Sequence, residues 1–74
     1  AYENAEMAYK QALVLNPGSP ALYLTLARLE IANGNSSKAR EYIAKSLEQK
    51  NNYTDAIFYL SQIEHFLLLS LRTF

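Results

Sequence analysis

Residues 20–53 decide the fold of this chain and read PALYLTLARLEIANGNSSKAREYIAKSLEQKNNY. Two segments within them, 20–33 and 37–50, are rich in alanine, leucine, lysine, arginine and glutamate, which favour helices. Gly34 stands between the segments and suits the left-handed conformation that ends many helices. The stretch therefore predicts a hairpin of two helices joined by a tight turn.

The first segment of this hairpin also carries a strand signal, because Leu22, Leu24 and Leu26 alternate along the chain. Ser19 and Pro20 favour a helix instead, since serine suits the N-cap and proline suits the first helical position. The segment is also longer than most strands. We therefore predict a helix here.

Two further helices are predicted at the ends of the chain, over residues 1–15 and 54–73. Their apolar residues recur at steps of three and four, as on one face of a helix. These residues are Ala5, Ala8, Tyr9, Ala12 and Leu13 in the first segment, and Ile57, Leu60, Ile63, Phe66 or Leu67, and Leu71 in the second. Pro17 ends the first helix, because the residue before a proline disfavours helical geometry. The predicted fold class is all-α, with four antiparallel helices.

The chain also repeats itself at an offset of 34 residues. Identical pairs at this offset include Ala5 and Ala39, Leu13 and Leu47, Leu26 and Leu60, and Glu30 and Glu64. A period of 34 residues with two helices per unit is typical of the tetratricopeptide repeat. The chain resembles that family over nearly its whole length. A plain antiparallel helical bundle with chance periodicity is the alternative.

The resemblance depends on residues that fit the family's motif. They are Tyr23 in place of a tryptophan, Leu26, Ala27, Gly34, Ala39, Ile43 and Ser46 in the central unit, and Tyr2, Ala5, Tyr9, Ala12 and Pro17 before it. The motif's small residues allow neighbouring helix axes to approach closely. Glu30 departs from the motif, which usually has an aromatic residue there, and Asn51 replaces its usual proline.

The resemblance implies one domain over residues 1–74, built from helix-turn-helix repeats that stack as a solenoid. Residues 1–19 would form the second helix of a truncated repeat, and residues 20–53 a complete repeat. Residues 54–74 would form the first helix of a following or capping repeat. The first helix of each pair is then expected to line the concave groove of a superhelix.

This groove is the candidate binding site for a peptide or a partner helix. Its candidate residues are Leu24, Thr25, Arg28, Ile31, Asp55, Phe58, Tyr59 and Gln62, with His65 or Phe66 as an extension. Aromatic side chains together with an arginine suit the recognition of a peptide. Alternatively, Leu24 and Phe58 pack against a neighbouring helix.

Composition and motifs point away from catalysis. Seven acidic and seven basic residues balance, so no strong electrostatic field favours nucleic acid. The chain has no cysteine, and His65 has no metal-ligating residue three or four positions away. We expect a non-catalytic scaffold with no cofactor and no metal, whose partner is a protein or peptide and not a nucleic acid.

Two alternatives to groove binding are kept. The apolar tail at residues 66–71 can mediate self-association as a homo-oligomer through the C-terminal helix, or contact a membrane-associated neighbour. It is far shorter than the roughly 20 residues that span a membrane. The chain can also be an accessory segment of a larger enzyme. It shows no targeting segment, which leaves the cytoplasm as the default location.

Overall fold

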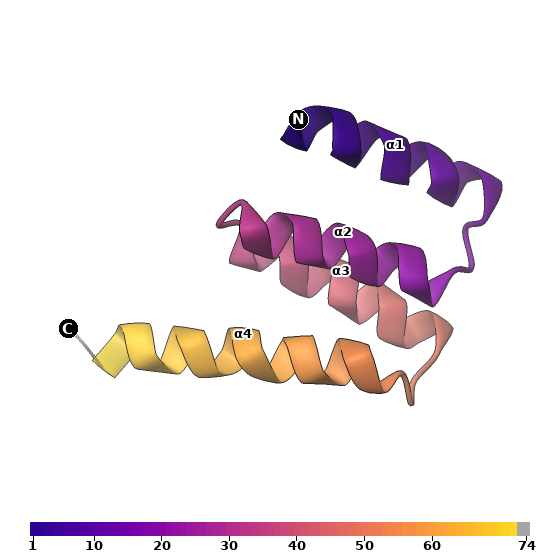
Figure 1. Cartoon of the computed structure of the whole chain (residues 1–74). Helices are drawn as coiled ribbons and strands as arrows, with labels where there is room; N and C mark the ends of the chain where they lie inside the picture. The colour runs from indigo at the N-terminus through magenta and orange to yellow at the C-terminus, as the bar shows by residue number, and fades with distance from the viewer. Residues whose placement is uncertain (73–74) are drawn as a thin grey trace.

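The computed structural model describes residues 1–72, except the side chains of residues 67 and 70–72. It contains four helices, which are α1 (Tyr2–Leu15), α2 (Pro20–Ala32), α3 (Ser36–Gln49) and α4 (Thr54–Arg72). Successive helices run antiparallel and are joined by short turns (Figure 1). The predicted all-α class is confirmed. The predicted end of the last helix at residue 73 lies outside the described residues.

The α2–α3 hairpin forms for the reasons that its sequence suggests. The Ser19 side chain accepts a hydrogen bond from the backbone N–H of Leu22 at 3.2 Å, and Pro20 is the first residue of α2. Gly34 has a φ of 82°, which a residue with a side chain rarely adopts. The N-cap and the glycine turn are therefore confirmed, and together they fix where α2 begins and ends.

The core lies between α2 and α3 and extends onto α4. Ala27 of α2 and Ala39 of α3 are fully buried, and their small side chains allow the two helices to lie close together. Ile43 of α3 packs into the same cluster, together with Ala56 and Ile63 of α4. Stacking a third helix on the hairpin thus buries apolar surface that the hairpin alone would leave in water.

Helix α1 packs on α2 without adding to this core. All of its residues are described, and none of them is buried. It is held instead by polar contacts and by half-buried side chains such as Tyr9 and Leu13. The four helices therefore form a stack with a dense centre and more weakly covered ends (Figure 1).

Candidate peptide-binding groove

One face of the stack brings together residues from α2 and α4 that the sequence places about 30 positions apart. The guanidinium carbon of Arg28 lies 5.7 Å from the ring centroid of Tyr59, within the range of a cation–π contact. The Tyr59 ring stacks on Phe58, with centroids 5.6 Å apart and an interplanar angle of 24°. Phe58 is 49% exposed, so this aromatic pair presents apolar surface to solvent.

Most of the predicted groove residues reach solvent. Arg28, Ile31, Asp55, Phe58 and Gln62 are exposed, and Thr25 and Tyr59 are half-buried. We call these seven residues the groove face. The hydroxyl of Thr25 donates to the carbonyl of Ala21 in its own helix at 2.9 Å, so this donor is already used.

Leu24 corrects the prediction. Its side chain is only 6% exposed and belongs to the core cluster that includes Ala56 and Ile63. The same cluster includes Ala39 and Ile43 of α3, so Leu24 is packed inside the stack of helices and is not accessible to a partner. The alternative interpretation of Leu24 as a packing residue is the correct one, with the neighbouring helix supplied by this chain.

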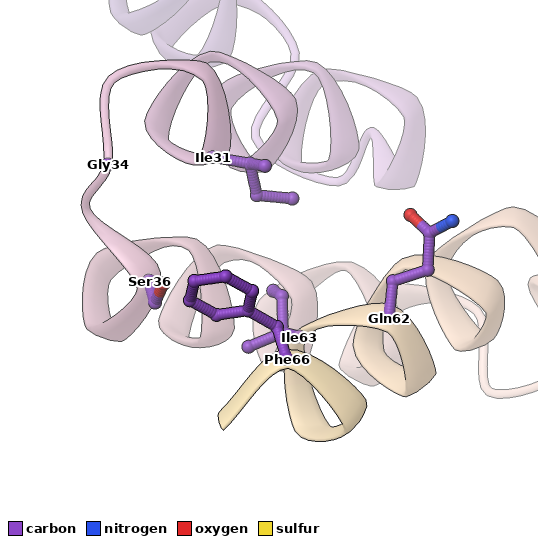
Figure 2. Close-up of a pocket in the computed structure, with 6 residues that line it drawn as sticks. All are labelled: Ile31, Gly34, Ser36, Gln62, Ile63 and Phe66. Atoms are coloured by element: carbon purple, nitrogen blue, oxygen red, sulfur yellow. The ribbon is translucent and has the colours of Figure 1, made fainter. Parts of the chain in front are cut away.

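A hollow of about 350 Å³ opens beside the groove face, between the end of α2 and the middle of α4. It is lined by Ile31, Gly34, Ser36, Gln62, Ile63 and Phe66. Figure 2 shows the Ile31 side chain pointing from α2 into this space, while the Phe66 ring extends from α4 toward Ser36. The lining is mainly apolar, with Gln62 as a polar group at the side. Such a hollow suits one apolar side chain of a ligand.

The sequence predicts Ile31 and Gln62 on this face, with Phe66 as an extension, but nothing in it predicts the hollow itself. The sequence predicts Gly34 as a turn residue and Ile63 as part of a helix face, and it gives no sign that either lines a hollow. A second hollow of about 350 Å³ lies between α1 and α2, lined by Tyr9, Thr25, Arg28, Leu29 and Ala32. Arg28 therefore lines the second hollow and also contacts Tyr59 of the groove face.

Comparison of the sequence with models of protein families gives a match. A family model of the tetratricopeptide repeat matches residues 1–63. This chain belongs to the tetratricopeptide repeat family. No curated protein and no solved structure matches the chain. Tetratricopeptide repeats are typically non-catalytic modules for protein–protein interaction, so the partner class is protein.

A buried carboxylate marks where this tetratricopeptide chain departs from the motif. Glu30 is fully buried, and both of its carboxylate oxygens accept hydrogen bonds from the hydroxyl of Tyr2 on α1, one of them at 2.9 Å. The side-chain amide of Asn35 donates to the same carboxylate at 3.4 Å. A buried charge is tolerated only when it is hydrogen-bonded, and these donors supply that condition.

The hydroxyl oxygen of Tyr2 also lies 3.2 Å from a carboxylate oxygen of Glu6, so Glu30 and Glu6 share its single proton. Glu6 pairs with Lys38 of α3 at 3.4 Å. The bond to Glu30, partial burial and the nearby Glu6 raise the pKa of Tyr2 above its usual 10.0. The charges of Glu6 and Glu30 likewise raise the pKa of Lys38. Partial burial opposes ionisation of Glu6, but the bond from Tyr2 and the charges of Lys10 and Lys38 outweigh it and lower its pKa. These contacts join α1 to both helices of the central hairpin.

Sequence reasoning missed this cluster, although Glu30 offered a signal. An acidic residue at a position that faces the core needs a donor from elsewhere in the chain.

The described residues show few other features that could carry chemistry. Among residues 1–72, no three His, Cys, Asp or Glu side chains gather as metal ligands do. None of the helices in that range combines the length and the hydropathy needed to cross a membrane.

Proposed function

We propose that the groove face binds an extended peptide or a helix of a partner protein. The observation that carries this proposal is the contact of Arg28, which lines the second hollow, with Tyr59, whose ring stacks on the exposed ring of Phe58. Arginine and aromatic residues are the side chains most often responsible for binding energy at protein interfaces.

The groove face also indicates what the bound segment would carry. An apolar side chain would occupy the hollow between Ile31 and Phe66, where it would leave water. A carboxylate or backbone carbonyl would accept hydrogen bonds from Arg28, because guanidinium groups pair well with oxygen acceptors. Asp55, one helical turn before Tyr59, would accept from a donor at the other end of the segment.

The test starts from peptides selected with the unmodified chain from a displayed library, followed by fluorescence anisotropy with a labelled peptide. Arg28→Ala should weaken binding at least tenfold, which corresponds to about 1.4 kcal/mol. Ile31→Glu should weaken it as well, because it places a charged carboxylate on the wall of the apolar hollow. Tyr59→Phe should bind nearly as well as the unmodified chain, because the ring is retained.

Arg40→Ala is the matched control, because Arg40 is a half-exposed arginine that pairs with Glu64 away from the groove face. It should leave the affinity unchanged. If the selected peptides bind Arg28→Ala and Ile31→Glu as tightly as Arg40→Ala, with equal helicity by circular dichroism, the groove assignment is wrong.

A further inference from the structure

Helices α1 and α4 each have a face that the other described helices do not fully cover. The face on α4 is that of the first helix of a repeat, and the face on α1 is that of the second helix. In the central hairpin, Leu26 and Ala27 of α2 fit the motif and are fully buried, and so is Glu30, whose carboxylate is bonded by Tyr2 of α1. Their counterparts 34 residues later are Leu60, Ser61 and Glu64 on α4. Leu60 and Glu64 are half-buried and Ser61 is exposed, so no second helix within the described residues covers this face of α4.

Helix α1 shows the complementary situation. The buried residues of α3 that face its partner helices are Ala39, Ile43 and Ser46. Their counterparts on α1 are Ala5, Tyr9 and Ala12, and each of these is only half-buried. Within residues 1–72, no first helix fully covers this face of α1.

We infer that α4 of one copy pairs with α1 of a second copy as α2 pairs with α3. The small side chains of Ser61 and Ala5 would meet where Ala27 and Ala39 allow close approach in the central hairpin. Tyr9 would fill the space that Ile43 fills there. Association would bury apolar side chains such as Ile57, which is 45% exposed.

The placement of α4 supports this continuation of the stack. Glu30 of α2 is bonded by Tyr2 from the helix before it, and Glu64 of α4 pairs with Arg40 from the helix before it, at 2.6 Å. At the 34-residue offset the counterpart of Tyr2 is Ser36, one helical turn from Arg40. Helix α4 therefore packs on α3 through a contact equivalent to the one by which α2 packs on α1. Its outer face is thus available to the next helix, as the outer face of α2 is to α3.

Such pairing is head-to-tail, so the two contacting surfaces differ and each bound copy leaves one surface open for another. Sedimentation equilibrium of the unmodified chain should show an average mass that rises steadily with concentration. Ser61→Arg should remain monomeric, because an arginine does not fit where the equivalent Ala27 is fully buried. Ala5→Arg should remain monomeric for the same reason, since the equivalent Ala39 is also fully buried.

An equimolar mixture of the two variants gives the decisive measurement. Ser61→Arg retains an intact α1 face and Ala5→Arg an intact α4 face, so the mixture should form a dimer and grow no further. Ser37→Arg, at an exposed position of α3, is the matched control and should associate like the unmodified chain. If Ala5→Arg loses helicity by circular dichroism, Ala8→Arg at an exposed position of α1 replaces it.

Three outcomes would overturn the inference. The unmodified chain could stay monomeric at every concentration, which would mean that a different helix covers these faces. Ala5→Arg could dimerise alone, which would indicate pairing between two α4 helices. Both single variants could associate as the unmodified chain does, which would assign association to exposed residues such as Phe66 and Leu69. Peptide binding by the groove face is measured separately and does not depend on any of these results.

Discussion

The hydroxyl of Tyr2 on α1 bonds to the buried carboxylate of Glu30 on α2, 28 residues along the chain. Glu30 occupies a position of α2 at which the repeat motif usually has an aromatic residue. Here the aromatic ring comes from α1 and the carboxylate from α2. The packing of α1 against α2 is therefore stabilised here by a hydrogen bond instead of an apolar contact.

Tyr2→Phe should lower the melting temperature by several degrees, because it leaves the buried Glu30 with a weaker set of donors. Adding Glu30→Gln to this variant should restore part of the loss, since a neutral amide costs less to bury than an incompletely bonded carboxylate. Thermal unfolding followed by circular dichroism measures both effects. Equal melting temperatures for Tyr2→Phe and the unmodified chain would show that the bond contributes nothing.

Alkaline conditions should remove the contribution of Tyr2. Its pKa is raised in the folded chain, so the contribution is complete below its usual pKa of 10.0 and declines as pH rises through the raised value. The pKa of Lys38 is shifted in the same direction. The difference in melting temperature between the unmodified chain and Tyr2→Phe should therefore be constant from pH 8 to about 10 and shrink above it. A difference that does not change up to pH 12 would contradict this assignment.

Gly34 and Gly18 offer a matched pair of substitutions. Gly34→Ala should destabilise the chain by about 1–2 kcal/mol, because alanine is strained at the positive φ of this residue. Gly18 does not have a positive φ, and a Cβ added there would meet Gln49 at an ordinary 3.6 Å. Gly18→Ala should therefore be neutral or stabilise by up to about 1 kcal/mol. Urea unfolding of both variants gives the comparison.

The hydroxyl of Ser46 provides a test of the contact between α3 and the start of α2. It is fully buried and donates to the carbonyl of Pro20 at 2.8 Å. Ser46→Ala should cost about 1 kcal/mol through the lost bond, and Ser46→Leu about 1–3 kcal/mol through overpacking. Ser37→Ala, at an exposed position, should change stability by less than about 0.5 kcal/mol. If Ser46→Leu matched Ser37→Ala, the contact would be looser than its burial indicates.

The helices and their ends could be predicted from sequence because their signals are local. Ser19 caps its own helix and Gly34 ends the same one, so a few adjacent residues contain the whole argument. The candidate groove depended instead on how helices stack. The assignment of Leu24 failed because the side of α2 that packs against the other helices cannot be read from α2 alone. The bond of Tyr2 to Glu30 escaped notice because nothing near either residue in the sequence marks the other.

The absence of buried residues in the fully described α1 has a consequence for how the chain opens. Helix α1 can detach while the packing of Ala27 against Ala39 stays intact, so its amide protons should exchange with water faster than those of α2 and α3. Each detachment also hydrates the carboxylate of Glu30. Helix α1 thus acts as a removable cover over a charge, and its opening can be followed without unfolding the hairpin beneath.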